Sequence, residues 1–331
     1  MTQQGHHHDM KMYGEIKLYS GTGSPDLAQK IANYLNQHLS QREVIQFPNE
    51  NIFVKLTRSA RGQDVYVIQT TSSPVHYNLM ELLIMIQTIR LDSAARITAV
   101  VPYLCYGRSD KKDQPRVPIT ARLVCDMIES AGADRYMTFD PHAGQIQGFF
   151  SIPGDVLTAS HMITAHINKS MRSQLHKLVV VSTDLGFAKK GRNYARDLNA
   201  SIAFVEKRRT ANDSKAKALT LIGNVKDRDG LIVDDEVLTG GSIEQAVGVV
   251  KKNGARDVYL AFIHPIFSED GAKRLAQLPI KHMITTDTVP ISPKILKLLK
   301  GRLTVLSIAP MLGEVIRRAH EGRSVGEMFN E

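Results

Sequence analysis

The stretch Leu231-Ile-Val-Asp-Asp-Glu-Val-Leu-Thr-Gly-Gly-Ser242 decides the fold expected for this chain. It begins with the apolar run Leu231–Val233, which predicts a strand buried on both faces. The acidic pair Asp234-Asp235 follows at the carboxyl end of that strand. The turn Thr239–Ser242 then opens into residues 243–252, whose apolar spacing predicts a helix. This order is typical of an open α/β sheet, in which ligands bind beyond the carboxyl ends of the strands.

The turn itself predicts a phosphate site. Gly240 and Gly241 let backbone N–H groups approach an anion closely, and the start of the helix adds the positive end of its dipole. Thr239 and Ser242 supply hydroxyl donors, while the acidic pair suits sugar hydroxyls or a metal-bound ligand. A glycine-containing turn beside a solvated acidic pair is the alternative interpretation. The order of strand, acidic pair, turn and helix favours the phosphate site.

Composition indicates a soluble globular protein with room for two domains. The chain has 331 residues, of which 43% are hydrophobic and 23% charged. No apolar run approaches the about 20 residues of a transmembrane helix, and the polar residues 1–13, which include His6 to His8, predict a disordered leader or tag. Cys105 and Cys125 are the only cysteines. We therefore expect reduced core thiols in a cytoplasmic protein, without disulfides or a zinc site.

The formal charge of +9 suits a polyanionic partner. Nucleic acid and small polyanionic substrates both satisfy it. Basic residues concentrate near 108–116 and 207–217, but no DNA- or RNA-binding motif accompanies them and aromatic residues make up only 6% of the chain. We expect small polyanionic substrates, and neither nucleic acid nor a membrane.

Strands and helices alternate along the chain. Ala131–His142 and Asn253–His264 are similar: each follows an apolar helix, turns at a glycine and runs through a strand to a histidine. This faint repeat predicts two similar α/β domains in tandem, joined between residues 153 and 160. The polar residues 210–217 are expected to form a mobile loop. Strands are predicted at 15–20, 44–47, 52–56, 64–69, 96–103, 135–139, 179–182, 202–205, 231–233, 258–263, 283–286 and 303–308, and helices at 26–35, 78–89, 118–129, 186–197, 243–252 and 311–321.

Several long motifs resemble those of the ribose-phosphate pyrophosphokinase (phosphoribosyl pyrophosphate synthetase) family, and the glycine turn resembles the ribose-5-phosphate loop of the type I phosphoribosyltransferase fold. The resemblance implies two tandem phosphoribosyltransferase-like domains, each a mainly parallel sheet flanked by helices. The first comprises residues 14–156 plus 310–331; the second, residues 157–309, carries the ribose-5-phosphate loop. The motifs that carry the resemblance are Asn78–Leu83, Arg96–Tyr103, Arg116–Arg122, His142–Phe150, Lys207–Arg209, Val233–Asp235, Thr239–Ser242, His264–Ser268 and Glu314–Arg318.

The resemblance also implies an activity and its partners. The family transfers the β,γ-pyrophosphoryl group of ATP to the 1-hydroxyl of ribose 5-phosphate, giving phosphoribosyl pyrophosphate and AMP with Mg²⁺ as cofactor. Its members assemble as homo-oligomers, dimers building a hexamer, with phosphate and ADP as effectors. Ser59, Arg61 and Ser307 match positions near the effector site, whereas Ala309 replaces a frequent hydroxyl residue.

Roles carried over from the family fall on four groups of residues. Such a transfer needs cations placed on the non-bridging oxygens and little covalent help from the protein, which suits two cationic side chains on a closing loop. The catalytic group is Lys207, Arg209 and His142; the metal group is His142 and Asp184. The ATP-binding group is Phe47, Asn49, Glu50, Asn51, Arg108, Ser109 and His142; the ribose-5-phosphate group is Arg209, Asp234, Asp235, Leu238, Thr239, Gly240, Gly241 and Ser242.

Some positions depart from the family pattern, mostly on the ATP side. Leu238 stands where the family usually has aspartate, Asn51 where it has glutamate, and Ser109 where it has glutamine. These departures leave two alternatives open: a weak or inactive paralogue acting as the regulatory subunit of a synthetase oligomer, and a transcription regulator that uses the turn as a sensor. Retention of the catalytic and metal groups favours an enzyme, and a regulator would need a DNA-binding element longer than the leader. Further departures are His76, Tyr77, Pro141, Gly144 and Ser151.

Overall fold

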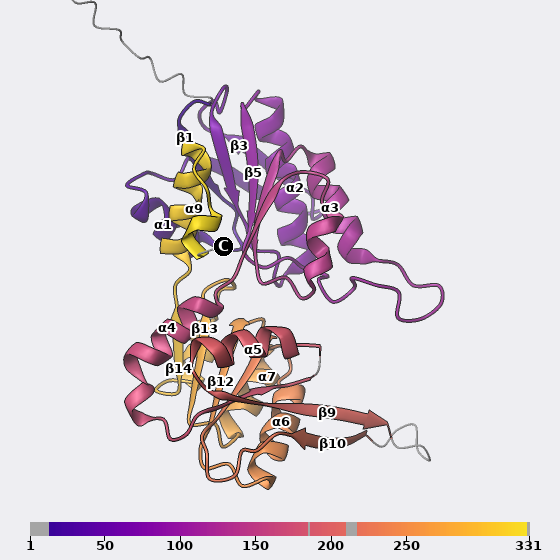
Figure 1. Ribbon diagram of the computed structural model, residues 1–331. Helices are drawn as coiled ribbons and strands as arrows, with labels where there is room; N and C mark the ends of the chain where they lie inside the picture. The colour runs from indigo at the N-terminus through magenta and orange to yellow at the C-terminus, as the bar shows by residue number, and fades with distance from the viewer. Residues whose placement is uncertain (1–12, 185, 210–216, 330–331) are drawn as a thin grey trace, which may run out of the picture.

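The computed structural model describes residues 13–184, 186–209 and 217–329. Two sheets flanked by helices form two lobes, one above the other (Figure 1). Most neighbouring strands in them run parallel, so the predicted fold class is confirmed. The predicted leader lies outside the described residues apart from Tyr13. Within the described ranges, no helix is long and apolar enough to cross a membrane.

The first sheet is parallel and covered on both faces. Side chains alternate along β4 (Asp64–Ile68). Tyr66 and Ile68 pack against α1 (Pro25–Tyr34) and α9 (Ala309–Glu321), while Val65 and Val67 pack against α2 (Val75–Leu91) and α3 (Thr120–Ala131). A hairpin of β2 (Arg42–Gln46) and β3 (Ile52–Leu56) also packs on α2. The strand order is β1 (Ile16–Ser20), β4 (Asp64–Ile68), β5 (Arg96–Val101), β6 (Arg135–Phe139) and β7 (Gly154–Leu157), and the helices are α1 (Pro25–Tyr34), α2 (Val75–Leu91), α3 (Thr120–Ala131), α9 (Ala309–Glu321) and the 3₁₀ turn η1 (Gly144–Phe149).

The second sheet reverses its strand order at β8 (Val179–Ser182). From there the chain adds β9 (Ser201–Arg209) and antiparallel β10 (Lys217–Ile222) on one side, and β11 (Gly230–Glu236), β12 (Val258–His264), β13 (His282–Thr286) and β14 (Leu303–Leu306) on the other. The point between β8 and β11 is where open α/β sheets bind ligands. Helices α4 (Ser160–Ser170) and α5 (Ala188–Asp197) cover one face, and α6 (Gly241–Lys252), α7 (Glu269–Gln277) and α8 (Pro293–Leu298) cover the other; short 3₁₀ turns occur at η2 (Arg172–Gln174) and η3 (Gly326–Phe329).

One apolar core runs through both lobes. It includes α1, α9 and the facing side of the first sheet, continues through Leu157 and Ile163, and reaches α4, α5 and the facing side of the second sheet. Hydrogen bonds also cross between the lobes: the Thr70 hydroxyl donates to the carbonyl of Thr288 over 3.0 Å. The chain leaves the first sheet after β7 and returns with α9, which packs on α1 (Figure 1). From these two sheets we propose two domains, residues 14–156 plus 310–331 and residues 157–309.

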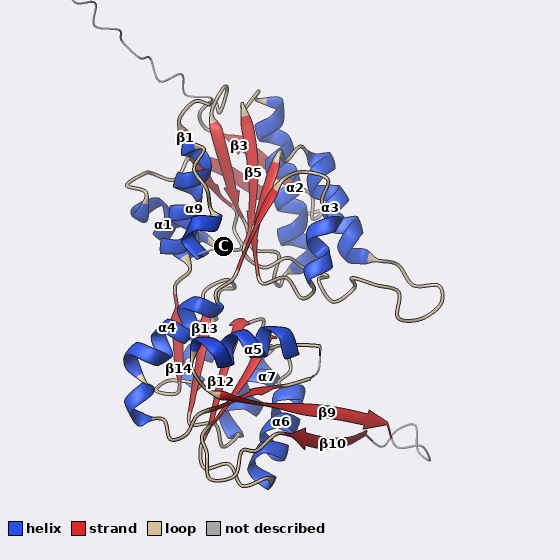
Figure 2. Cartoon of the chain, viewed as in Figure 1, coloured by secondary structure: helices blue, strands red, loops and turns tan. Residues whose placement is uncertain are grey.

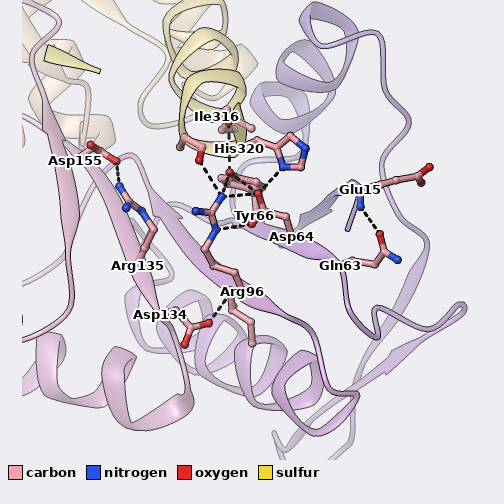
Figure 3. Close-up of polar contacts among 12 residues, drawn as sticks. Glu15, Gln63, Asp64, Tyr66, Arg96, Asp134, Arg135, Asp155, Ile316 and His320 are labelled. Atoms are coloured by element: carbon pink, nitrogen blue, oxygen red, sulfur yellow. Dashed lines mark hydrogen bonds and ion pairs between the residues drawn. The ribbon is translucent and has the colours of Figure 1, made fainter. Parts of the chain in front are cut away.

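A buried polar cluster ties α9 to the first sheet (Figure 3). Arg96 of β5 donates to both oxygens of Asp64 of β4, over 2.7 and 2.6 Å. Asp64 also accepts a hydrogen bond from the Tyr66 hydroxyl at 3.0 Å and contacts Nδ1 of His320 at 2.8 Å. Arg96 in turn donates to the carbonyl of Ala319 over 3.1 Å. Because the Asp64 side chain has no exposed surface, these partners take the place of water around its oxygens.

Candidate active site

The predicted acidic pair lies at the carboxyl end of β11, beside the end of β8. The register places Ser182 opposite Val233, so Asp184 and the pair Asp234-Asp235 follow at the same edge of the sheet. The negative charge of Asp184 helps to raise the pKa of Asp234, which agrees with the position of both residues at one edge of the sheet. The structure therefore brings together a predicted metal ligand and the predicted ribose-binding carboxylates.

The turn Thr239–Ser242 begins α6. Gly240 has φ +73°, a left-handed conformation that favours glycine, and it is the N-cap of the helix. The start of α7 holds the turn in place, since the backbone N–H of Ser268 donates to the Leu238 carbonyl over 3.1 Å. Gly271 approaches so closely that a Cβ there would lie 2.1 Å from the same oxygen. Leu238, the residue before the turn, has 41% of its surface exposed, and the start of a helix leaves backbone N–H groups without partners within the helix.

The pKa values of the two carboxyl groups of the pair shift in opposite directions. Burial, and then the neighbouring Asp235, raise the pKa of Asp234 well above its usual value. Burial acts in the same direction on Asp235, but hydrogen bonds from His142 and Asp234 outweigh it and lower the pKa of Asp235. The two pKa values therefore move apart, so that Asp234 holds a proton more readily than Asp235 does. Both carboxyl groups can hydrogen-bond to sugar hydroxyls.

His142 comes from the first sheet, just beyond β6, and reaches the pair. Its Nδ1 lies 2.6 Å from Oδ2 of Asp235, and this contact raises the pKa of the imidazole. Lys190 of α5 donates to the carbonyl of Pro141 over 3.1 Å and so fixes the segment that carries His142. In the described part of the chain, no group of three or more His, Cys, Asp or Glu side chains is placed to hold a metal ion.

Arg108 and Ser109 follow β5 and have different surroundings. Arg108 crosses to the second sheet, where its Nε pairs with Oε1 of Glu236. Ser109 instead lies at the start of α3, where its hydroxyl accepts the backbone N–H of Thr120 over 3.3 Å. Arg108 therefore lies close to the acidic pair, while the Ser109 side chain is engaged in holding a helix end.

The predicted adenine-site residues lie in the turn of the β2–β3 hairpin. Phe47 N donates to the Asn51 carbonyl and Glu50 N to the Phe47 carbonyl, each over 2.8 Å. The Phe47 and Phe53 rings pack 6.2 Å apart and are 45% and 43% exposed. Among the described residues, no hydrogen bond, ion pair or ring contact links Phe47, Asn49, Glu50 or Asn51 to Arg108, Ser109 or His142. The structure does not join this turn to the strand-end group within one chain.

The backbone of Lys207 and Arg209 forms the end of β9. In the antiparallel ribbon with β10, Lys207 lies opposite Leu219 and Arg209 opposite Lys217. This ribbon projects from the lower lobe (Figure 2). The side chains of Lys207 and Arg209, and most of the predicted loop 210–217, lie outside the described residues.

Two cavities differ in their relation to this group. One of about 280 Å³ is bordered by Asp140, Lys190 and Asp235, so it adjoins the acidic pair. A larger one of about 760 Å³ lies between the lobes and is lined in part by Tyr77 and Phe267. None of the predicted site residues lines the described part of the larger cavity.

Two residues at the site were not predicted from sequence. Glu236 directly follows the acidic pair, and it pairs with Arg108 across the two sheets. The sequence could have indicated this pair, because it shows a third carboxylate at the strand end and a basic loop after β5. Nothing in the sequence distinguishes Lys190 in this way, because the charged end of a lysine on an amphipathic helix ordinarily lies in solvent.

Comparison with known proteins identifies the family. Residues 16–132 match the model of the N-terminal domain of ribose phosphate pyrophosphokinase, and residues 210–330 match a phosphoribosyl synthetase-associated domain. A ribose-phosphate pyrophosphokinase of Aquifex aeolicus is 40% identical over 314 residues, covering 95% of this chain and 99% of that protein. One of Rhodopirellula baltica is 42% identical over 318 residues, covering 96% and 99%.

A solved structure agrees with these relatives. The crystal structure of phosphoribosylpyrophosphate synthetase from Mycobacterium smegmatis has a TM-score of 0.87 and 37% identity to this chain, covering 93% of it and 99% of that chain. The match extends over both sheets, and it confirms the resemblance carried by the sequence motifs. Relatives this similar, matched along nearly their whole length, show that the chain belongs to the ribose-phosphate pyrophosphokinase family.

Proposed function

We propose that the crevice at the ends of β8 and β11 transfers the β,γ-pyrophosphoryl group of ATP to the 1-hydroxyl of ribose 5-phosphate. The observation that carries this proposal is the pair Asp234-Asp235 followed by the glycine turn at the start of α6. This arrangement offers hydroxyl-binding carboxyls and, shortly after them in the chain, an anion-binding helix start. Membership of the family supplies the reaction, which the fold alone would not.

The ribose 5-phosphate would bind with its phosphate at Thr239, Gly240, Gly241 and Ser242. Its ring hydroxyls would then reach the strand end, where the carboxyl groups of Asp234 and Asp235 would hydrogen-bond to them. Leu238 contributes its backbone, since its carbonyl is held by Ser268 and its apolar side chain is exposed. Arg209 would add a cation from the β9–β10 ribbon.

The nucleotide would lie on the side of the first sheet. Arg108 would contribute a cation on that side, since it pairs with Glu236 next to the acidic pair, and Lys207 and Arg209 would neutralise the transferring group. His142 keeps Nδ1 on Asp235, so its Nε2 is the nitrogen available to the substrates. Phe47, Asn49, Glu50, Asn51 and Ser109 complete the proposed ATP group. Because the hairpin residues do not join the site within one chain, this part of the proposal depends on a neighbouring subunit.

The residues present fit a magnesium ion that arrives with the substrates. Asp184 is exposed at the strand end, and the bond from His142 to Asp235 is the carboxylate–histidine arrangement that orients a metal-binding imidazole. Mg²⁺ keeps several waters and takes few protein ligands when phosphates are bound, so a protein cage is not needed. When bound, the ion would neutralise charge on the phosphate oxygens.

Assembly and regulation follow the family in this proposal. The exposed Ile45, Phe47 and Phe53 give the hairpin an apolar surface suited to a homo-oligomer, proposed as dimers that build a hexamer. Phosphate and ADP are the proposed effectors. Ser59 and Arg61 lie together, the Ser59 hydroxyl accepting the Arg61 N–H over 3.2 Å. A cytoplasmic location is part of the same proposal.

The test uses the purified chain alone with Mg²⁺, ATP and ribose 5-phosphate. We expect AMP and phosphoribosyl pyrophosphate in equal amounts over many turnovers. Lys207→Ala should lose transfer by roughly two to three orders of magnitude while ribose 5-phosphate still binds, because only the stabilisation of the transferring group is removed. Binding of ribose 5-phosphate without any turnover by the unchanged chain would refute catalysis and favour the regulatory-subunit alternative.

A further inference from the structure

Glu236 is the third carboxylate in a row at the end of β11, and it is almost completely buried. Only 5% of its side-chain surface is exposed. It lies opposite His264 in the register with β12. Burial and then the charge of Glu236 raise the pKa of the Tyr103 hydroxyl, which places Tyr103 beside it. A carboxylate in such surroundings needs a cationic partner.

That partner comes from the other sheet. Arg108, in the loop after β5, pairs through its Nε with Oε1 of Glu236. Of the two groups, Glu236 is the fixed one, because it stands on a buried strand whose neighbours hold it on both sides. Arg108 is the adaptable one, with 60% of its side chain exposed.

The contact leaves part of the guanidinium available. Among the described residues, neither Nη1 nor Nη2 of Arg108 donates a hydrogen bond. Arginine presents its donors in a rigid planar fork, so fixing Nε also fixes the direction of the outer edge. That edge matches two oxygens of a phosphate group, and a guanidinium held in advance loses less freedom when the phosphate binds.

We propose that Glu236 is a positioning residue that holds Arg108 for the phosphates of the bound nucleotide. The ligand class rests on the proposed function, since ATP is the nucleotide of that reaction. Glu236 itself touches no substrate. It acts through Arg108, and it links the nucleotide side of the site to the strand that carries the ribose-binding carboxyls.

The test compares Glu236→Gln with the unchanged chain. The variant keeps the shape of the side chain and removes its charge. Equilibrium dialysis with Mg²⁺-ATP should show about tenfold weaker binding, equivalent to about 1.4 kcal/mol. In turnover assays the KM for ATP should rise with it, while the KM for ribose 5-phosphate stays unchanged. Glu321→Gln, which removes an exposed carboxylate paired with Arg323, is the matched control and should change neither constant.

A double-mutant cycle separates positioning from a structural role. In the Arg108→Ala background, Glu236→Gln should weaken ATP binding by less than about twofold, because no guanidinium is left to position. Unchanged or tighter ATP binding by Glu236→Gln, or equal losses in both backgrounds, would overturn the inference. An unchanged chain that binds ATP without turnover would refute the proposed function alone, because the binding comparison still decides the role of Glu236. An unchanged chain that binds no ATP would overturn both.

Discussion

Replacing Asp64 by asparagine should destabilise the protein far more than the same change at its surface. Asp64 accepts four contacts: Arg96 reaches both carboxylate oxygens, and Oδ2 also meets Tyr66 and His320. An amide has one acceptor oxygen, so its NH₂ group would face donors that now meet an oxygen. The Arg96 side chain, only 9% exposed, would also lose its counter-charge.

The magnitude follows from that burial. Removing one partner of a buried ion pair costs about 3–5 kcal/mol, since the remaining charge stays buried without compensation. The control is Asp126→Asn, which breaks the Arg122–Asp126 pair on the outside of α3, where the two side chains are 46% and 45% exposed. An exposed pair of this kind contributes about 0.3–0.5 kcal/mol.

Urea unfolding followed by far-UV circular dichroism measures the difference, and the chain contains no tryptophan that could serve instead. The transition that includes the first sheet should shift to lower urea for Asp64→Asn and hardly move for Asp126→Asn. Hydrogen exchange in α9 should speed up in the first variant, because the cluster ties that helix to β4 and β5 (Figure 3). Equal stability of the two variants would refute the reasoning.

The remaining predictions concern the glycine turn and acid stability. Gly271→Ala should raise the KM for ribose 5-phosphate at least about tenfold, because a Cβ 2.1 Å from the Leu238 carbonyl oxygen would displace the turn. The control is Gly248→Ala, which should leave this KM unchanged because nothing lies within 4 Å of the added Cβ. Equal KM values for the two variants would contradict the assigned site. Burial opposes ionisation of Asp229, but bonds from Arg256 outweigh it and lower the pKa of Asp229 below 3.8. The stabilisation that ionised Asp229 provides is therefore complete above its ordinary pKa of 3.8, and it is lost as the pH falls through the lower pKa of the folded state. The gap between the urea midpoints of the unchanged chain and Asp229→Asn should stay constant while the pH is well above 3.8 and narrow as the pH falls below that value. A gap that stays constant below 3.8 would contradict the linkage.

The sequence predicted the elements with strong local signals. The apolar strands β4, β5, β8, β11 and β12 were found because runs of buried side chains need no knowledge of their neighbours. The helix α7 was not predicted: it is short and contains Gly271, which lowers helix propensity. The edge strand β7 fell in the expected join between domains, and it is a strand only because β6 supplies its hydrogen bonds.

For the site, too, residues that are adjacent in sequence could be predicted together, and contacts between separate sheets could not. Asp234, Asp235 and the glycine turn are adjacent in sequence, so their order was enough to place them together. The contacts of His142 with Asp235 and of Arg108 with Glu236 join residues from different sheets, and no local pattern specifies how two sheets meet. The separate position of the hairpin turn has the same origin, since motif spacing gives no information about how far a hairpin lies from the strand ends of its sheet.

The apolar core that continues from α1 and α9 into α4 and α5 has a mechanical consequence. A hinge motion between the lobes would have to separate close-packed side chains and break the hydrogen bond from Thr70 to Thr288. A large opening of the crevice is therefore unfavourable in free energy. The two lobes therefore behave as one frame during turnover. Substrate entry, water exclusion and product release must be achieved by short segments at the rim, and adaptation of this enzyme to other substrates would proceed through exchange of rim side chains on a fixed scaffold.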